Sequence, residues 1–301
     1  MTACTMFNIP VNEFSKENPK HQELRTAAKC VIPSTRIPTQ NGILRIKDLC
    51  NNIPEVDKFE DIKGVHIIHP DGRYVPAIQF YNGGVEKCKK ITLENGMNLT
   101  GTPTHKIYVL QDNNVVDKQL SDIEIGDIVL LQGCVPNHSN KTYLSIDVSK
   151  GSRILPPLDS PIFSSLGEIE CKILGYIFVY GLKLNKNLRL IFDTRKEMGT
   201  CETFLKHAGM KGYLKHIEKS QYILSFAYDK VFYDLLDMLE VFQEEKIPEF
   251  VFRVDKASAA AFLSVIIEKA LDENGEIVES SKQLLEDIQL LLFLQYGIIT
   301  Y

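Results

Sequence analysis

The chain has 301 residues, which is long enough for two domains. Hydrophobic residues make up 44% and charged residues 24% of the sequence, a globular composition that excludes a disordered or fibrous protein. The net charge is −5. Residues 1–150 contain 17 Lys+Arg and 17 Asp+Glu, whereas residues 151–301 contain 17 Lys+Arg and 22 Asp+Glu, so the whole negative excess lies in the second half. DNA binding needs clustered cations, so the bulk charge gives it no support.

Targeting signals and cysteine usage indicate the compartment. The sequence contains no apolar run of about 18 residues, and its start lacks the basic and apolar stretches of a signal peptide. The 7 cysteines are widely spaced and never form a CxxC pair, which favours reduced thiols over a disulfide framework. We therefore expect an intracellular protein, in the cytoplasm or nucleus, that makes no membrane contact.

The first half reads as a β domain. Residues 1–29 are polar, with one helix-prone stretch that ends at Lys29. From position 30 onward, short alternating apolar runs are separated by turns, which is typical of short strands. Asn-Gly at 41–42 and 95–96, and Asn-Gly-Gly at 82–84, predict hairpins.

The second half alternates helices and strands. Residues 132–161 are rich in Pro, Ser and Asn and are expected to form a linker. The order of elements restarts near residue 247, which suggests two related halves, the second incomplete. The predicted helices cover 166–184, 197–208, 230–241, 256–271 and 281–294, and the predicted strands cover 188–194, 212–217 and 222–227. The fold class expected is therefore multidomain α+β.

Three ordered segments of the first half carry a family resemblance. CVIPSTRIPTQNGILRIKDL begins at Cys30, KKITLENGMNLTGTPTHKIYVL contains Thr102 and His105, and LSDIEIGDIVLL covers 120–131. In this order and spacing, they resemble the motifs of an intein, whose splicing domain is the all-β, horseshoe-like Hint fold. The resemblance covers about 100 residues, and the T-x-x-H motif taken alone is a weak signal.

The resemblance implies a self-directed reaction at the Lys29–Cys30 bond. The Cys30 thiol is nucleophilic and would attack the preceding carbonyl in an N-to-S acyl shift that gives a thioester. His105 would protonate the departing nitrogen, and Thr102 would orient the peptide or contact the oxyanion. This chemistry needs no cofactor. Gly126-Asp127 is expected to be a structural turn. Taken singly, a lone Cys and a lone His are more often structural residues.

The resemblance has two departures. Pro33-Ser34 stands where the family often carries Gly-Asp, although Thr35 remains. Inteins also close with a second His motif and a terminal His-Asn, whereas the given sequence ends in Gly-Ile-Ile-Thr-Tyr301. We therefore expect thioester formation and N-terminal cleavage, and not completed splicing, from the sequence as it stands.

The second half resembles a LAGLIDADG homing endonuclease inserted in an intein. CKILGYIFVYGL (171–182) is similar to the first LAGLIDADG helix, residues 247–277 to the second, and SSKQLLEDIQLLLFLQYGII (280–299) to the helix that follows. In that family each helix ends in an aspartate that holds Mg²⁺. Tyr180 and Ala270 stand at those positions, so the resemblance implies a degenerate nuclease, and Mg²⁺ would be needed only if cleavage survives.

The interpretation is thus an extein-like segment (1–29), a Hint domain (30–150) and an endonuclease-like domain (160–301) with two αββ-type repeats, the second truncated. The partners implied are the flanking host-protein segments and double-stranded DNA. One alternative is a free-standing LAGLIDADG DNA endonuclease or its DNA-binding remnant. Another is that the apolar helices are ordinary core helices. Cys88 is expected on a strand of the β domain, which favours a core position for this residue over a role as redox partner of Cys30.

Overall fold

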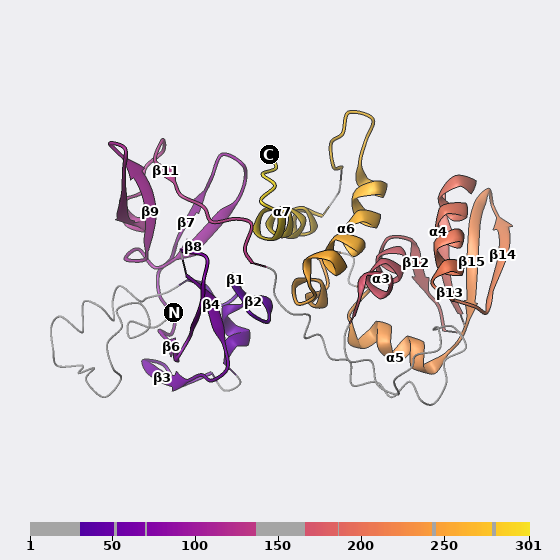
Figure 1. The fold of residues 1–301 in the computed structure, drawn as a ribbon, viewed down its shortest axis with the longest axis horizontal. Helices are drawn as coiled ribbons and strands as arrows, with labels where there is room; N and C mark the ends of the chain where they lie inside the picture. The colour runs from indigo at the N-terminus through magenta and orange to yellow at the C-terminus, as the bar shows by residue number, and fades with distance from the viewer. Residues whose placement is uncertain are drawn as a thin grey trace. The chain divides into compact units, whose positions relative to one another are not determined.

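In the computed structural model, the described residues are 31–50, 53–69, 71–136, 166–185, 187–242, 245–278 and 281–301. They form a mixed α+β protein whose sheets are all antiparallel. The chain divides into two compact units (Figure 1). The first contains the described residues up to 136 together with Gln289–Tyr301, and the second contains those from 166 to Ile288. No helix of the described part is long and apolar enough to cross a membrane.

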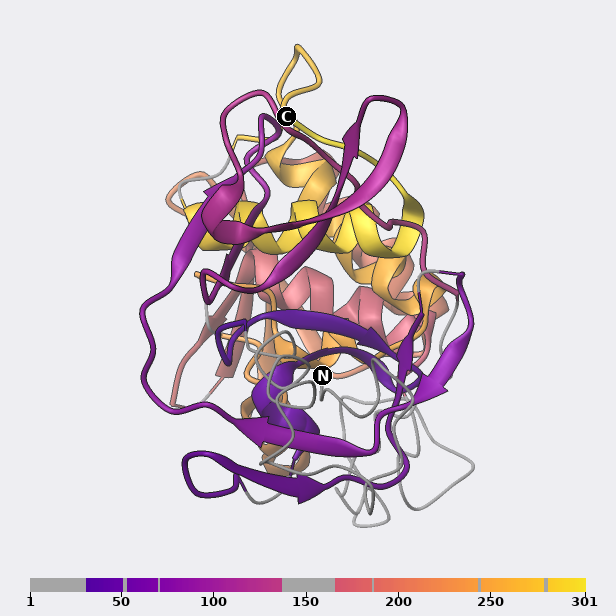
Figure 2. The same cartoon turned by 90° about the vertical axis from the view of Figure 1, so that its left-hand side faces the viewer.

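The first unit consists of small sheets (Figure 2). One has the order β2-β1-β4-β5, a second β10-β9-β11, and β3 pairs with β6 and β7 with β8. The strands are β1 Arg36–Thr39, β2 Gly42–Arg45, β3 Lys58–Asp61, β4 His66–Ile68, β5 Tyr74–Pro76, β6 Gln79–Asn82, β7 Lys89–Thr92, β8 Asn98–Gly101, β9 Lys106–Gln111, β10 Asn114–Gln119 and β11 Ile128–Val129. Short 3-10 helices, η2 (Ile46–Leu49) and η3 (Leu120–Asp122), follow β2 and β10.

Turn chemistry explains the hairpins of this unit. Thr39 pairs with Gly42 in β1–β2, and Thr92 with Asn98 in β7–β8, so two of the predicted hairpins are confirmed. Gly42 and Gly96 have φ of 111° and 84°, which glycine adopts at no steric cost. The hairpin predicted at 82–84 is wrong. There the Asn82 side chain accepts a hydrogen bond from the Gly84 amide (3.0 Å) and starts a loop between sheets.

The second unit packs helices on a four-stranded sheet of order β12-β13-β15-β14. Side-chain caps begin three of its helices: Thr194 for α4, Asp229 for α5 and Asp255 for α6. The elements are α3 Glu168–Tyr180, β12 Gly181–Lys183, β13 Asn187–Phe192, α4 Arg195–His207, β14 Tyr213–Glu218, β15 Gln221–Ala227, α5 Lys230–Met238, η5 Glu249–Phe252, α6 Lys256–Ala270 and α7 Lys282–Tyr296.

Helix α3 ends four residues before the predicted end at Leu184, because Gly181 has extended backbone and starts β12. The core of the unit lies where α3 packs on α6. A Cβ added at Gly175 would lie 2.9 Å from the Phe262 carbonyl oxygen, so the two helices approach closely at this glycine. Phe262 is fully buried, and its ring lies 5.5 Å from those of both Phe178 and Phe250.

Helix α7 begins in the second unit and ends in the first. Its last turn is capped by the start of the predicted linker, where the amides of Cys134 and Val135 donate to the carbonyls of Phe293 (3.1 Å) and Leu294 (2.7 Å). The side-chain amide of Gln289 (Nε2) donates to the Asn95 carbonyl in the β7–β8 turn (2.6 Å). Residues 133–135 are therefore part of the packed structure of the first unit, whereas the sequence assigned them to a linker.

Candidate functional site

The T-x-x-H motif lies where β8 ends. Val31 forms an isolated antiparallel bridge with Gly101, and the Ile32 amide donates to the Thr100 carbonyl (3.2 Å). The stretch just after position 30 therefore runs beside the stretch just before Thr102. The predicted nucleophile Cys30 lies outside the described residues, so its immediate successor in the sequence, Val31, marks this end of the site.

Backbone hydrogen bonds hold the turn from Thr102 to His105 in place. The His105 amide donates to the Thr102 carbonyl (2.9 Å), which closes the turn before β9. The Leu120 amide donates to the His105 carbonyl (2.8 Å), and the Ser121 amide donates to the Pro103 carbonyl (2.9 Å). Two predicted site residues, Thr102 and His105, thus belong to one rigid turn that is fixed against η3.

Thr102 carries a buried hydroxyl that has no hydrogen-bond partner among the described residues. The residue is 6% exposed, and its Oγ1 has no partner among the residues that the structure describes. A buried hydroxyl without a partner costs about 1–3 kcal/mol, so folded proteins rarely keep one without a reason. A hydroxyl in this state is available to donate to a substrate oxygen at the site.

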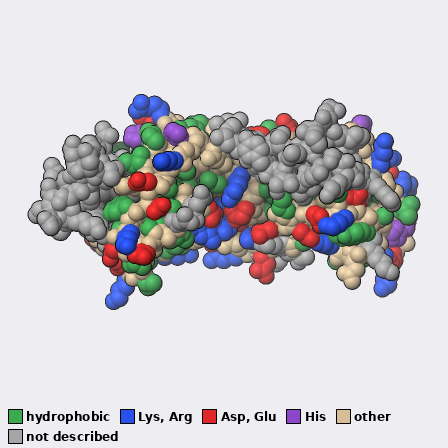
Figure 3. All heavy atoms as spheres, turned by 90° about the horizontal axis from the view of Figure 1, so that it is seen from below, with side chains coloured by type: hydrophobic (Ala, Val, Ile, Leu, Met, Phe, Trp, Pro, Cys, Tyr) green, Lys and Arg blue, Asp and Glu red, His purple; other side chains and the backbone are tan. Residues whose placement is uncertain are grey.

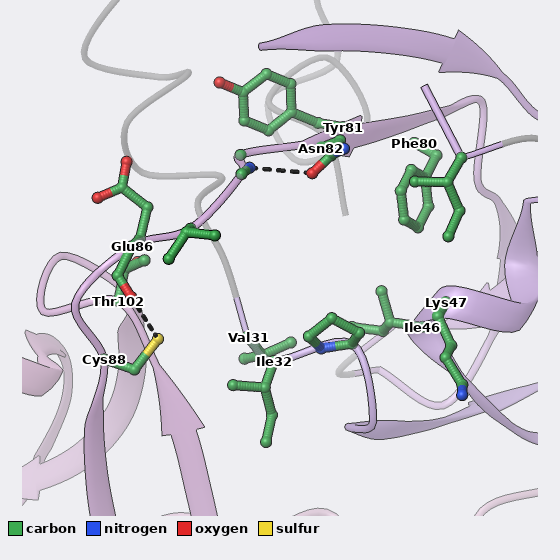
Figure 4. A pocket seen from close by; sticks show the side chains of 15 residues that line it. Val31, Ile32, Ile46, Lys47, Phe80, Tyr81, Asn82, Glu86, Cys88 and Thr102 are labelled. Carbon is green, nitrogen blue, oxygen red and sulfur yellow. Dashed lines mark hydrogen bonds between the residues drawn. The ribbon is translucent and has the colours of Figure 1, made fainter. Parts of the chain in front are cut away.

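A pocket opens beside Thr102 (Figure 4). Its volume is about 290 Å³, and its walls come from five parts of the first unit: residues 31–33, η2, Ile53, the end of β6 with the loop that runs to Cys88, and Thr102. Most of the lining is apolar, for example Val31, Ile46 and Phe80. Sequence reasoning missed this pocket, because its walls are far apart in the chain and only the loop after Asn82 signalled a turn.

Cys88 lines the same pocket as Thr102. The expectation that Cys88 is a core residue is wrong: it is exposed and lies just before β7, which begins at Lys89. Its Sγ lies 3.7 Å from the Glu86 carbonyl oxygen. Figure 4 shows the Cys88 side chain on the side of the pocket where Val31 lies.

The Gly126-Asp127 pair is a structural turn, as expected. Asp127 accepts a hydrogen bond from the Glu124 amide (2.7 Å) and pairs with the Lys118 ammonium (2.7 Å). These contacts, the backbone hydrogen bond first, hold the pKa of the Asp127 carboxyl below its usual range. The carboxylate is therefore used in fixing the turn between η3 and β11.

A second cluster of charges lies at the ends of α3 and α6 in the second unit. Lys269, in the last turn of α6, places its Nζ 2.8 Å from Asp193 and 3.0 Å from Glu197. The same Nζ lies 5.5 Å from the ring centroid of Tyr180, whose hydroxyl donates to Glu197 (3.4 Å). Hydrogen bonding to Asp193 is the main reason why the pKa of Lys269 is raised, so this ammonium stays charged.

These residues do not fit the magnesium site that the resemblance implies. Burial, with Glu197 nearby, raises the pKa of Tyr180 to about 12, so its phenol is neutral at physiological pH. Ala270 has no ligand atom in its side chain, and the two neighbouring carboxylates, Asp193 and Glu197, already hold an ammonium. Among the described residues, no three His, Cys, Asp or Glu side chains gather as metal ligands. Hard divalent cations need several free oxygen ligands.

Comparisons with known proteins give one distant relative. No protein-family model matches the chain. Over 236 residues, which are 76% of the chain, the sequence is 24% identical to transcription initiation factor IIB of Methanocaldococcus jannaschii. The chain spans 31% of the length of that relative. The chain is therefore similar to one part of a longer archaeal protein.

Proposed function

We propose that this chain is an intein-type self-processing protein that rearranges the Lys29–Cys30 peptide bond. The observation that supports this most is the pairing of Val31 with Gly101, because it joins the position after the proposed nucleophile to the residue before Thr102. The proposed reaction requires the Cys30 thiol, the Thr102 hydroxyl and the His105 imidazole to meet at one peptide bond. The rigid turn from Thr102 to His105 supplies two of the three from a single hydrogen-bonded unit.

The chemistry follows from the residue types. The Cys30 thiol releases its proton to water, its sulfur attacks the Lys29 carbonyl carbon, a C–S bond forms and the C–N bond to Cys30 breaks. The departing nitrogen takes a proton from His105, because an amide nitrogen leaves poorly without one. The Thr102 hydroxyl, which has no other described partner, donates to the oxygen that becomes negative in the tetrahedral intermediate. The product is a thioester that a small thiol can cleave.

A host-and-insert arrangement would account for the partial coverage of the distant relative. That relative is named as a transcription initiation factor, and the similar stretch is less than a third of its length. A mobile insert shared by two unrelated host proteins would give a match of this kind, covering most of the insert and a minor part of the host. We therefore propose that a host protein flanks the inserted part of this chain, and that residues 1–29 belong to that host protein.

The experiment that tests the proposal is intact mass spectrometry after incubation with a small thiol. We expect a break at Lys29–Cys30 in the wild type, and no break in Cys30→Ala. His105→Gln should slow the reaction about 100-fold or more, in the range typical of a lost general acid. His69→Gln, a change at an exposed histidine in the β4–β5 turn, is the matched control and should cleave normally. An intact wild-type chain after prolonged incubation would reject the proposal.

For the second unit we propose a nuclease-like fold that does not cut DNA. The supporting observation is that the Lys269 ammonium is bound by Asp193 and Glu197 at the ends of the paired helices. Acidic and basic side chains are also interspersed over the described surface seen in Figure 3. Incubation of a plasmid library with the protein and Mg²⁺ should give no nicked or linear product. Site-specific nicking would contradict this part of the proposal.

A further inference from the structure

The pocket beside Thr102 has the composition of a small-molecule site. It combines apolar walls with one thiol, Cys88, and one buried hydroxyl, that of Thr102, which has no hydrogen-bond partner in the described structure. The hydroxyl is a second observation, independent of the thiol, that points to a ligand. A 290 Å³ cavity is at the small end of ligand pockets, so it suits a molecule about the size of an amino acid.

The charges of the lining narrow the class of ligand. Lys47 and Glu86 both line the pocket and are exposed, and Figure 4 shows them on opposite sides of it, so its rim carries one positive and one negative side chain. A zwitterion such as an amino acid carries the complementary pair of charges. The thiol adds a reactive group, because an exposed cysteine exchanges with disulfides when its thiolate attacks one of their sulfur atoms.

We propose that Cys88 is a modification site for an amino-acid-sized disulfide such as cystine, and that the attached group blocks the acyl shift. The Cys88 sulfur attacks one sulfur of cystine, a new S–S bond forms, and one cysteine leaves as a thiol with the proton from Cys88. The attached half then fills the pocket next to Thr102 and Val31. The proposed block of the acyl shift rests on the proposed function, whereas the modification of Cys88 does not.

The other described cysteines differ from Cys88 in burial or position. Cys171 and Cys201 are fully buried, and burial raises the pKa of both thiols far above the physiological range, so they are inert. Cys50 is also buried. Cys134 is exposed but lies against the end of α7, outside the pocket, which makes it the matched control.

The test uses the full chain with Cys30→Ser, which removes the competing thiol and replaces it with a hydroxyl that can accept the acyl group as an ester. After incubation with cystine, peptide mapping should find the adduct on Cys88. Hydroxylamine cleavage after Lys29 should fall about tenfold or more, because crowding displaces the reacting groups. A reductant should restore it. With Cys88→Ala added, cystine should have no effect, and with Cys134→Ala added the inhibition should persist.

Each other outcome has a defined meaning. An adduct on Cys134 with none on Cys88 overturns the proposal, and so does a Cys88 adduct that leaves cleavage unchanged. If the Cys30→Ser chain does not cleave even before cystine is added, a second variant tests the block. This variant carries Cys88→Phe and keeps Cys30. The phenyl ring should fill the pocket and stop thiol cleavage at Lys29–Cys30, while the thermal unfolding temperature stays unchanged. Normal cleavage in this variant would overturn the proposal that a filled pocket blocks the acyl shift. If wild type also fails to cleave, the proposed function has failed, and the adduct map alone decides the site.

Discussion

The Nζ atom of Lys269 lies 2.8 Å from the Asp193 carboxylate, which ties the last turn of α6 to the residue that follows β13. Glu197 and the ring of Tyr180 complete the surroundings of this ammonium. The cluster lies next to Ala270, where the family resemblance expects a metal-binding aspartate. The Lys269 ammonium, a cation supplied by the chain itself, thus lies between the nearby carboxylates.

Replacing Lys269 with Met should destabilise the second unit by about 1 kcal/mol, because the pairs are partly exposed and therefore individually weak. Burial alone raises the pKa of Glu197, but hydrogen bonds from Lys269 and Thr194 bring it below its ordinary value. A group with a lowered folded pKa contributes stability above its unfolded pKa, near 4.3 for Glu, and loses it as the pH falls. The difference between wild type and Lys269→Met should therefore shrink below about pH 4.

Denaturant unfolding across this pH range measures the effect. Lys282→Met is the control, because among the described residues Lys282 pairs only with Glu286, at 3.8 Å within α7. That variant should unfold like the wild type at every pH. A Lys269→Met difference that grows on acidification would contradict the assigned pairing.

Gly175→Ala should destabilise the second unit by about 1–3 kcal/mol, the usual cost of overpacking a core. The new methyl group would meet the Phe262 carbonyl oxygen at 2.9 Å and Val265 at 3.2 Å, so α3 and α6 must separate. Gly199→Ala on α4 is the matched control, because a Cβ there meets nothing within 4 Å. It should stabilise by about 0.5–1 kcal/mol through helix propensity. Thermal unfolding of both variants measures the change in stability. Equal changes in the two variants would show that the close approach of α3 and α6 is not the cause of the destabilisation.

Gly133→Ala should weaken the attachment of α7 to the first unit. An added Cβ would lie 2.9 Å from the Phe293 carbonyl oxygen, which accepts the hydrogen bond from Cys134. We expect a loss of about 1–3 kcal/mol and faster amide exchange in the last turn of α7. Leu131→Ala, a change at an exposed neighbour, should alter stability by less than about 0.5 kcal/mol. Unchanged exchange in Gly133→Ala would mean that this contact does not hold the helix end.

Thr102→Val should separate stability from activity. Replacing a buried hydroxyl that has no partner in the described structure with a methyl group removes a desolvation cost, so the unfolding temperature should stay the same or rise. Thiol cleavage at Lys29–Cys30 should fall about 100-fold if the hydroxyl stabilises the oxyanion. Thr102→Ser keeps the hydroxyl and should retain most of the activity at slightly lower stability. Loss of stability in Thr102→Val would show that the hydroxyl has a structural partner.

Local sequence patterns predict most of the strands and helices and many of the turns between them. The hairpins at Asn41-Gly42 and Asn95-Gly96 depend on neighbours within a few residues, so local chemistry predicts them. The T-x-x-H motif was visible for the same reason, because its turn closes within four residues.

Which of these local segments pack against one another depends on the whole fold. The exposure of Cys88, the pocket that it shares with Thr102, the attachment of α7 through Gly133 and the carboxylates around Lys269 all join residues far apart in the chain. Such contacts depend on how whole elements pack, and packing is set by burial and shape at many positions at once. A window of sequence carries no record of the side chains that will lie against it, and for that reason these features could not be read from the sequence.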